Sequence, residues 1–99
     1  MNNFIGKRLE QYTVKRPQEV LLVTVEIADE QDKVAVFKGF SSSLMRPTAF
    51  DADVPVIPEG AIILSIDRIR SPYNPEAPRY IQRAISWEAM QDLLLEVGV

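Results

Sequence analysis

The clearest pattern in the chain is an alternation of apolar and polar positions over residues 19–28. An extended backbone turns successive side chains to opposite faces, so this spacing puts the apolar side chains of one set on the same face. That set is Leu21, Val23, Val25 and Ile27. The other face is apolar where the segment begins and polar where it ends. The pattern predicts a central β-strand that is covered on both faces at one end.

The alternation resumes over residues 33–40, after a short polar connection at 29–32. Alternating segments joined by a few polar residues favour an antiparallel hairpin, so 19–28 and 33–40 are predicted to pair. A third alternating segment covers 61–70, and the Pro-Glu-Gly at 58–60 before it suits a type I turn. A further strand is therefore predicted over 61–70.

The end of the chain has helical spacing. Ser86 is a residue that commonly caps a helix N-terminus, and Gly98 stands where a helix would end. Ile85 and Met90 have the spacing of a hydrophobic staple. The apolar face carries Trp87, Met90, Leu94 and Val97, and the polar face carries Glu88, Gln91, Asp92 and Glu96. These positions predict a C-terminal amphipathic helix with Trp87 at the edge of the core.

Two segments leave the secondary structure open. Residues 4–16 fit a short helix at 3–8 followed by a strand at 9–15, or one single strand. The strand over 9–15 is favoured. Residues 79–84 fit a short strand and a helical turn equally well.

Between these elements the chain is predicted to form two loops. Residues 41–43 are all serine, and the region from residue 44 to 57, with prolines at 47, 55 and 58 in and beside it, reads as an ordered, irregular loop. Residues 71–78 contain three more prolines. Strands followed by one terminal helix, without β-α-β alternation, predict a single α+β domain over 1–99.

The predicted architecture is a small bent antiparallel β-sheet or a partly open β-barrel, with the C-terminal α-helix packed over one end. The alternative is a plain meander with the helix across its face. The composition agrees with one folded domain, because 46% of the 99 residues are hydrophobic and 25% are charged.

The chain contains no His and no Cys. It therefore lacks the ligands of thiolate zinc sites and iron–sulfur clusters, the cysteine nucleophile, and the usual general base near neutral pH. No set of residues pairs a nucleophile with a base and an orienting third group. The sequence predicts a protein that is not an enzyme and that holds no cofactor or metal.

The 11 basic and 14 acidic residues give a net charge of −3, so the protein as a whole would repel nucleic acid and anionic membranes. The N-terminus has no apolar stretch of signal-peptide length, and no apolar run could cross a bilayer. These features predict a cytoplasmic protein of a bacterium, or a stromal-type protein, that does not bind membranes.

Several short segments carry a family resemblance: 36–44, 56–61, 65–69, 72–75 and 86–88. On these segments the chain resembles a small uncharacterised protein family of cyanobacteria and plant plastids, over about residues 19–96. The resemblance implies a role connected with the photosynthetic cell. It implies no activity and transfers no functional residue.

A first candidate site combines a flexible glycine, three hydroxyl groups and two cations. Its members are Lys38, Ser41, Ser42, Ser43 and Arg46. Backbone N–H groups and charge of this kind can hold a phosphate or a carboxylate. The spacing of a phosphate-binding loop is missing, so the favoured interpretation is a strand end whose hydroxyls satisfy the loop backbone.

A second candidate site is a run of arginines interleaved with tyrosines. Its members are Arg68, Arg70, Tyr73, Arg79, Tyr80 and Arg83. On a strand Arg68 and Arg70 share a face and form a basic ridge. Arg and Tyr are enriched at the centres of protein interfaces, and they also contact phosphates and stack on the bases of single-stranded nucleic acid.

The leading hypothesis is a non-catalytic protein-interaction or assembly module that uses this ridge and the 41–50 loop. The alternative hypothesis is a small domain that binds single-stranded nucleic acid through the same Arg/Tyr ridge. Open strand edges also predict that two copies can pair as a homodimer.

Overall fold

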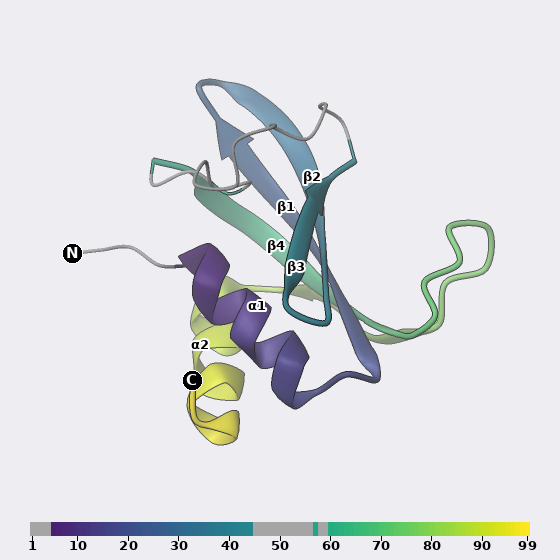
Figure 1. The fold of residues 1–99 in the computed structure, drawn as a ribbon. Helices are drawn as coiled ribbons and strands as arrows, with labels where there is room; N and C mark the ends of the chain where they lie inside the picture. The colour runs from purple at the N-terminus through teal and green to yellow at the C-terminus, as the bar shows by residue number, and fades with distance from the viewer. Residues whose placement is uncertain (1–4, 45–56, 58–59) are drawn as a thin grey trace.

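The fold is an open five-stranded antiparallel sheet with strand order β3-β2-β1-β4-β5 and two helices packed against one face (Figure 1). The computed structural model describes residues 5–44, 57 and 60–99. The elements are α1 (Ile5–Lys15), β1 (Glu19–Ile27), β2 (Glu30–Phe37), β3 (Phe40–Ser43), β4 (Ile62–Arg70), β5 (Tyr80–Ile85) and α2 (Trp87–Val97). The predicted α+β class is confirmed, and the sheet is not closed into a barrel.

The core lies between the sheet and the two helices. The predicted inner face of β1 is confirmed, because Leu21, Val23 and Val25 are fully buried. They belong to one cluster with residues of both helices and the neighbouring strands, including Leu9, Tyr12, Val34, Val36, Ile66, Met90 and Leu94. A smaller cluster on the opposite face consists of Val20, Leu22 and Ile69, with Phe37 and Tyr73 packed against it.

The predicted hairpin between β1 and β2 is confirmed, but its connection is shorter than 29–32. Ala28 and Asp29 both have positive φ, 52° and 68°, as a two-residue turn of the I′ kind requires. The strand therefore resumes at Glu30, and the predicted polar connection is mostly strand.

A second tight turn at Lys38 and Gly39 adds β3 to the outer edge of β2. The predicted strand over 33–40 is therefore wrong at its end, and residues 41–43 are strand rather than loop. Gly39 has φ +88°, and a Cβ at this position would lie 2.9 Å from Cγ2 of Val14. A residue without a side chain is needed both for the turn and for the approach of α1.

The favoured strand over 9–15 is wrong, because these residues belong to α1. Helical spacing turns Leu9 and Tyr12 to the sheet, where both are buried, while Val14 stays 60% exposed. The alternation of Tyr12 and Val14 suggested a strand. Tertiary packing of the Leu9 side of the helix decides otherwise.

On the other side of β1 lies β4, so the chain is not a plain meander. The ambiguous segment at 79–84 is strand β5, which pairs with β4 and forms the second edge of the sheet. The predicted C-terminal helix is confirmed: the Ser86 side chain accepts a hydrogen bond from the Ala89 N–H, and Gly98 ends the helix in a left-handed conformation. Trp87 packs at the edge of the core, as predicted.

Residues 58–59 of the turn predicted at 58–60 and residues 45–56 of the loop predicted at 44–57 lie outside the described residues. Within the described parts of the chain, no helix is long and apolar enough to cross a membrane.

Candidate functional site

Arg68, the first member of the predicted ridge, is held in a hydrogen-bonded network at the end of the sheet. Its Nε and Nη2 atoms donate to the two carboxylate oxygens of Glu19, at 3.0 and 2.9 Å. The Tyr12 hydroxyl donates to the same carboxylate at 2.8 Å, and Arg68 Nη1 donates to Oε1 of Gln82 at 2.8 Å. The network thus joins α1, β1, β4 and β5.

The charges in this network stabilise one another. Burial acts to raise the pKa of Glu19, but hydrogen bonds from Arg68 and Tyr12 and the positive charge of Arg16 lower it below its ordinary value. Burial, together with the hydrogen bond to Glu19, raises the pKa of Tyr12 to about 12. The hydrogen bond to Glu19 also raises the pKa of Arg68. At neutral pH the network therefore holds a carboxylate, a guanidinium and a protonated phenol.

The structure separates Arg68 from the tyrosines of the predicted ridge. Arg68 donates to Glu19, the same carboxylate to which Tyr12 of α1 donates, on the helix side of the sheet. Its neighbour Ile69 belongs to the cluster on the opposite face, with Tyr73 packed against that cluster. The ridge is therefore divided, and Arg68 acts in the stability of the fold.

The remaining arginines of the ridge gather around β5. We call Arg70, Arg79, Tyr80, Ile81 and Arg83 the β5 patch. All five are exposed, with Tyr80 at 38% and Ile81 at 43%. Across the described parts of the chain, none of the three arginines has a carboxylate partner within ion-pair distance.

Arg83 is fixed by an aromatic ring instead of a carboxylate. Its guanidinium carbon lies 4.2 Å from the centroid of the Tyr80 ring, which is the geometry of a cation–π contact. The backbone of Arg79 meets that of Arg70 on the next strand, where Arg70 N donates to Arg79 O at 2.8 Å. The patch is therefore built on two paired strands.

The serine group at β3 has different surroundings. Ser41 Oγ donates to Glu10 Oε2 at 2.7 Å, and Ser43 Oγ lies 2.9 and 3.0 Å from the two carboxylate oxygens of Asp32. An anion here would meet carboxylates, so these contacts favour the interpretation in which the hydroxyls serve the fold. Ser42 is exposed, Lys38 lies over the Phe37 ring at 5.2 Å, and Arg46 lies outside the described residues.

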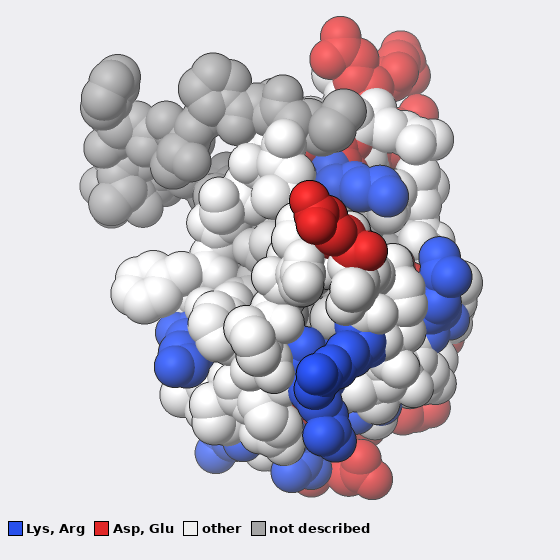
Figure 2. Space-filling view, turned by 90° about the vertical axis from the view of Figure 1, so that its right-hand side faces the viewer, with Lys and Arg blue, Asp and Glu red and all other residues white. Residues whose placement is uncertain are grey.

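The two predicted groups do not form one site, because β3 and β5 are opposite edges of the sheet. Lys38 and the three serines lie at one edge, and the β5 patch lies at the other. On the face drawn in Figure 2, Lys and Arg form several separate groups and not one continuous strip.

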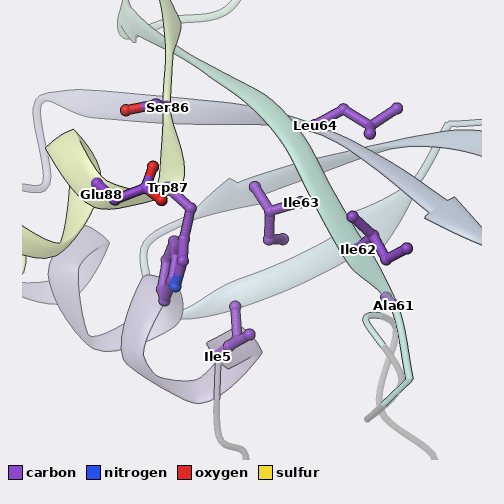
Figure 3. A pocket seen from close by; sticks show the side chains of 8 residues that line it. All are labelled: Ile5, Ala61, Ile62, Ile63, Leu64, Ser86, Trp87 and Glu88. Atoms are coloured by element: carbon purple, nitrogen blue, oxygen red, sulfur yellow. The ribbon is translucent and has the colours of Figure 1, made fainter.

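A groove that the sequence did not predict lies between the start of β4, the first turn of α2 and the start of α1. Its volume is about 460 Å³, and apolar side chains make most of its wall. Figure 3 shows the Trp87 indole extending from α2 toward Ile5, with Ile63 beside it. Spacing could not indicate this groove, because it forms only where three distant segments meet.

Ile81 of the β5 patch was also not predicted as a site residue. The sequence did not single out Ile81, because residues 79–84 fitted a strand and a helical turn equally well.

Within the described ranges, no group of three or more Asp and Glu side chains is placed to hold a metal ion. In the described part of the chain, the β5 patch and the apolar groove are two candidate binding surfaces.

Comparison with known protein families identifies a match that covers most of the chain. No curated protein matches this chain, and no solved structure does. A family described as a domain of unknown function, DUF7734, matches residues 6–94, which leaves only five residues outside the match at each end. The chain therefore belongs to the DUF7734 family.

Proposed function

We propose that this domain is a non-catalytic protein-interaction module and that the β5 patch is its binding surface. One observation carries the proposal: exposed Tyr80 and Ile81 are flanked by arginines that have no carboxylate partner in the described structure. Tyr and Arg are the residue types that most often dominate the binding energy of protein interfaces.

The position of the patch supports the same function. An edge strand presents side chains and backbone groups to the solvent along its whole length. Five of the six residues of β5 are exposed, and only Ile85 is buried. An aromatic ring, an aliphatic side chain and several cations on one edge combine the apolar contact and the charge that a protein interface uses.

The best-connected polar network does not favour catalysis. The Glu19 carboxylate already accepts hydrogen bonds from Arg68 and Tyr12, and it is only 4% exposed. Tyr12, with an ordinary pKa of 10.0 that the fold raises to about 12, is protonated at neutral pH. The network thus lacks a group that is both accessible and ready to accept a proton.

Affinity capture with two matched double variants tests the proposal. Native extract is passed over the wild-type protein, over Arg79→Ala/Arg83→Ala and over Lys7→Ala/Lys15→Ala, each with and without nuclease. Both double variants remove two positive charges from exposed positions, but the lysines lie on α1. We expect defined proteins to be retained by the wild type and the lysine variant and lost with the arginine variant.

Two results would contradict the proposal. If the arginine variant retained the same proteins as the wild type, the β5 patch would not be the binding surface. If the proteins disappeared after nuclease and nucleic acid bound directly with a steep salt dependence, the domain would be a nucleic-acid binder. An extract from a photosynthetic cell also tests the role that the family resemblance implied.

A further inference from the structure

We infer that the partner of the β5 patch is an acidic protein segment whose carboxylates pair with Arg79 and Arg83. The inference rests on the proposed function and names the chemistry of the partner. It begins from the position of Arg83 over Tyr80, a contact that a regular strand could not make.

Residues three apart in a regular strand point to opposite faces of the sheet. Tyr80 and Arg83 are three apart, yet they stack at 4.2 Å. Their meeting depends on irregular pairing: the register with β4 shifts between Ile66 and Arg68 and again between Arg68 and Ile69. Ala84, with φ 54°, adds a left-handed residue at the same end. Bulges of this kind turn side chains in new directions and recur beside functional sites.

Stacking on an aromatic ring holds the plane of a guanidinium while leaving its N–H groups open at the edge of the plane. Those N–H groups form the fork that binds a carboxylate through two parallel hydrogen bonds. Arg83 is therefore oriented before a ligand arrives. Arg70 and Arg79, which are joined by a backbone hydrogen bond where β5 begins, add positive charge to the same two strands.

Two acidic groups on the neighbouring strands β1 and β4 already have hydrogen-bond partners. The Glu19 carboxylate binds Arg68, and Asp67 Oδ1 accepts a hydrogen bond from the Ala84 N–H at 2.8 Å. Neither carboxylate forms an ion pair with an arginine of the patch within the described structure. Charge complementarity selects an acidic partner.

Two other occupants fit less well. A second copy paired edge to edge would bring the arginines of both copies together, and the two register shifts in β5 disturb the backbone row that strand pairing needs. A nucleic acid carries a charge at every phosphate, but it would meet only the three arginines of the β5 patch. A short acidic segment of a protein carries the carboxylates that suit the fork and apolar side chains for Ile81.

The test is a titration of the 99-residue chain with a capped oligoglutamate peptide, in which the NMR signals of the arginine Nε–H groups are followed. We expect the signals of Arg79 and Arg83 to shift, and Arg79→Ala/Arg83→Ala to weaken binding about tenfold. Arg83→Lys keeps the charge but loses the planar fork, so we expect a weakening of about fivefold. Lys7→Ala/Lys15→Ala should bind like the wild type.

Each contrary result overturns the inference in a recognisable way. Equal binding by the wild type and the arginine double variant would place the acidic ligand elsewhere. Tighter binding of an oligothymidylate of equal charge would select nucleic acid, and self-association that the arginine variant abolishes would select a second copy. If extract proteins require the patch but oligoglutamate does not bind, only this inference fails, whereas capture that ignores the patch refutes the proposed function itself.

Discussion

Arg68 and Arg83 stand on neighbouring strands, and both belong to the run of arginines that the sequence offers as a ridge. Arg68 is bound by a carboxylate, and its side chain is 17% exposed. Arg83 is exposed and is held by the ring of Tyr80. The same residue type thus stabilises the fold in one strand and presents a charge to the solvent in the next.

The register of the sheet decides this difference. Glu19 lies opposite Arg70 but binds Arg68, its diagonal neighbour on the same face. One carboxylate therefore satisfies one arginine and leaves Arg70 without a carboxylate partner among the described residues. The comparison teaches that the arginines to test for binding are those that the register leaves without an acid.

Removing the Glu19 carboxylate should have the largest effect on the free energy of unfolding. Glu19→Ala leaves the Arg68 guanidinium and the Tyr12 hydroxyl without their common acceptor in a buried place. We expect the free energy of unfolding to fall by about 3 kcal/mol in urea denaturation, the size found when one partner of a buried pair is removed. Glu30→Ala, an exposed control at the start of β2, should change it by less than about 0.5 kcal/mol. Equal effects of the two variants would refute a structural role for Arg68.

Removing the Tyr12 hydroxyl should lower the free energy of unfolding by a smaller amount. Tyr12→Phe deletes one hydrogen bond while the pairing of Glu19 with Arg68 remains, so we expect a loss of about 1 kcal/mol at neutral pH. Tyr80→Phe is the matched control, because no hydrogen bond of its hydroxyl is found within the described structure.

Tyr12→Phe also tests the raised pKa of Tyr12, through the stability of the protein at high pH. The folded protein raises the pKa of Tyr12 to about 12, above its ordinary value of 10.0. This contribution to stability is complete below pH 10 and is lost as the pH rises from 10 to 12, because the unfolded chain ionises first. Stability curves in alkaline buffer should therefore fall less steeply for Tyr12→Phe than for wild type. Parallel curves would show that the phenol titrates normally.

Removing the arginines of the β5 patch should have the smallest effect on stability. Arg79→Ala/Arg83→Ala deletes exposed side chains that bind no carboxylate in the described structure, so we expect a change within about 0.5 kcal/mol. Thermal unfolding measures it. A loss as large as that of Glu19→Ala would mean that the patch, like Arg68, serves the fold.

Local patterns predicted the elements whose side chains repeat at one clear period. The inner face of β1, its hairpin with β2, and α2 with its Ser86 cap are of this kind. α1 was misread because its buried Leu9 and Tyr12 fit helical spacing while Tyr12 and Val14 alternate. β3 was missed because Phe40–Ser43 is mostly serine and forms a strand only by pairing with β2.

The sequence could predict which arginines belong to the candidate site. It could not predict which of them binds a carboxylate within the fold and which stay exposed. Which arginine meets Glu19 depends on the pairing of β1 with β4, and that register is a property of the whole sheet. The contact of Arg83 with Tyr80 depends on bulges that regular periodicity does not reveal.

The place of β1 in the sheet has a consequence for the growing chain during synthesis. β1 can pair with β2 at once, but the other edge of β1 waits for β4, and Glu19 waits for an arginine 49 residues further along. A charged residue on an unpaired edge discourages association with other chains. We expect the Glu19 charge to reduce association of the nascent hairpin with other chains during this interval. Once Arg68 has been synthesised, the same carboxylate becomes part of a buried ion pair.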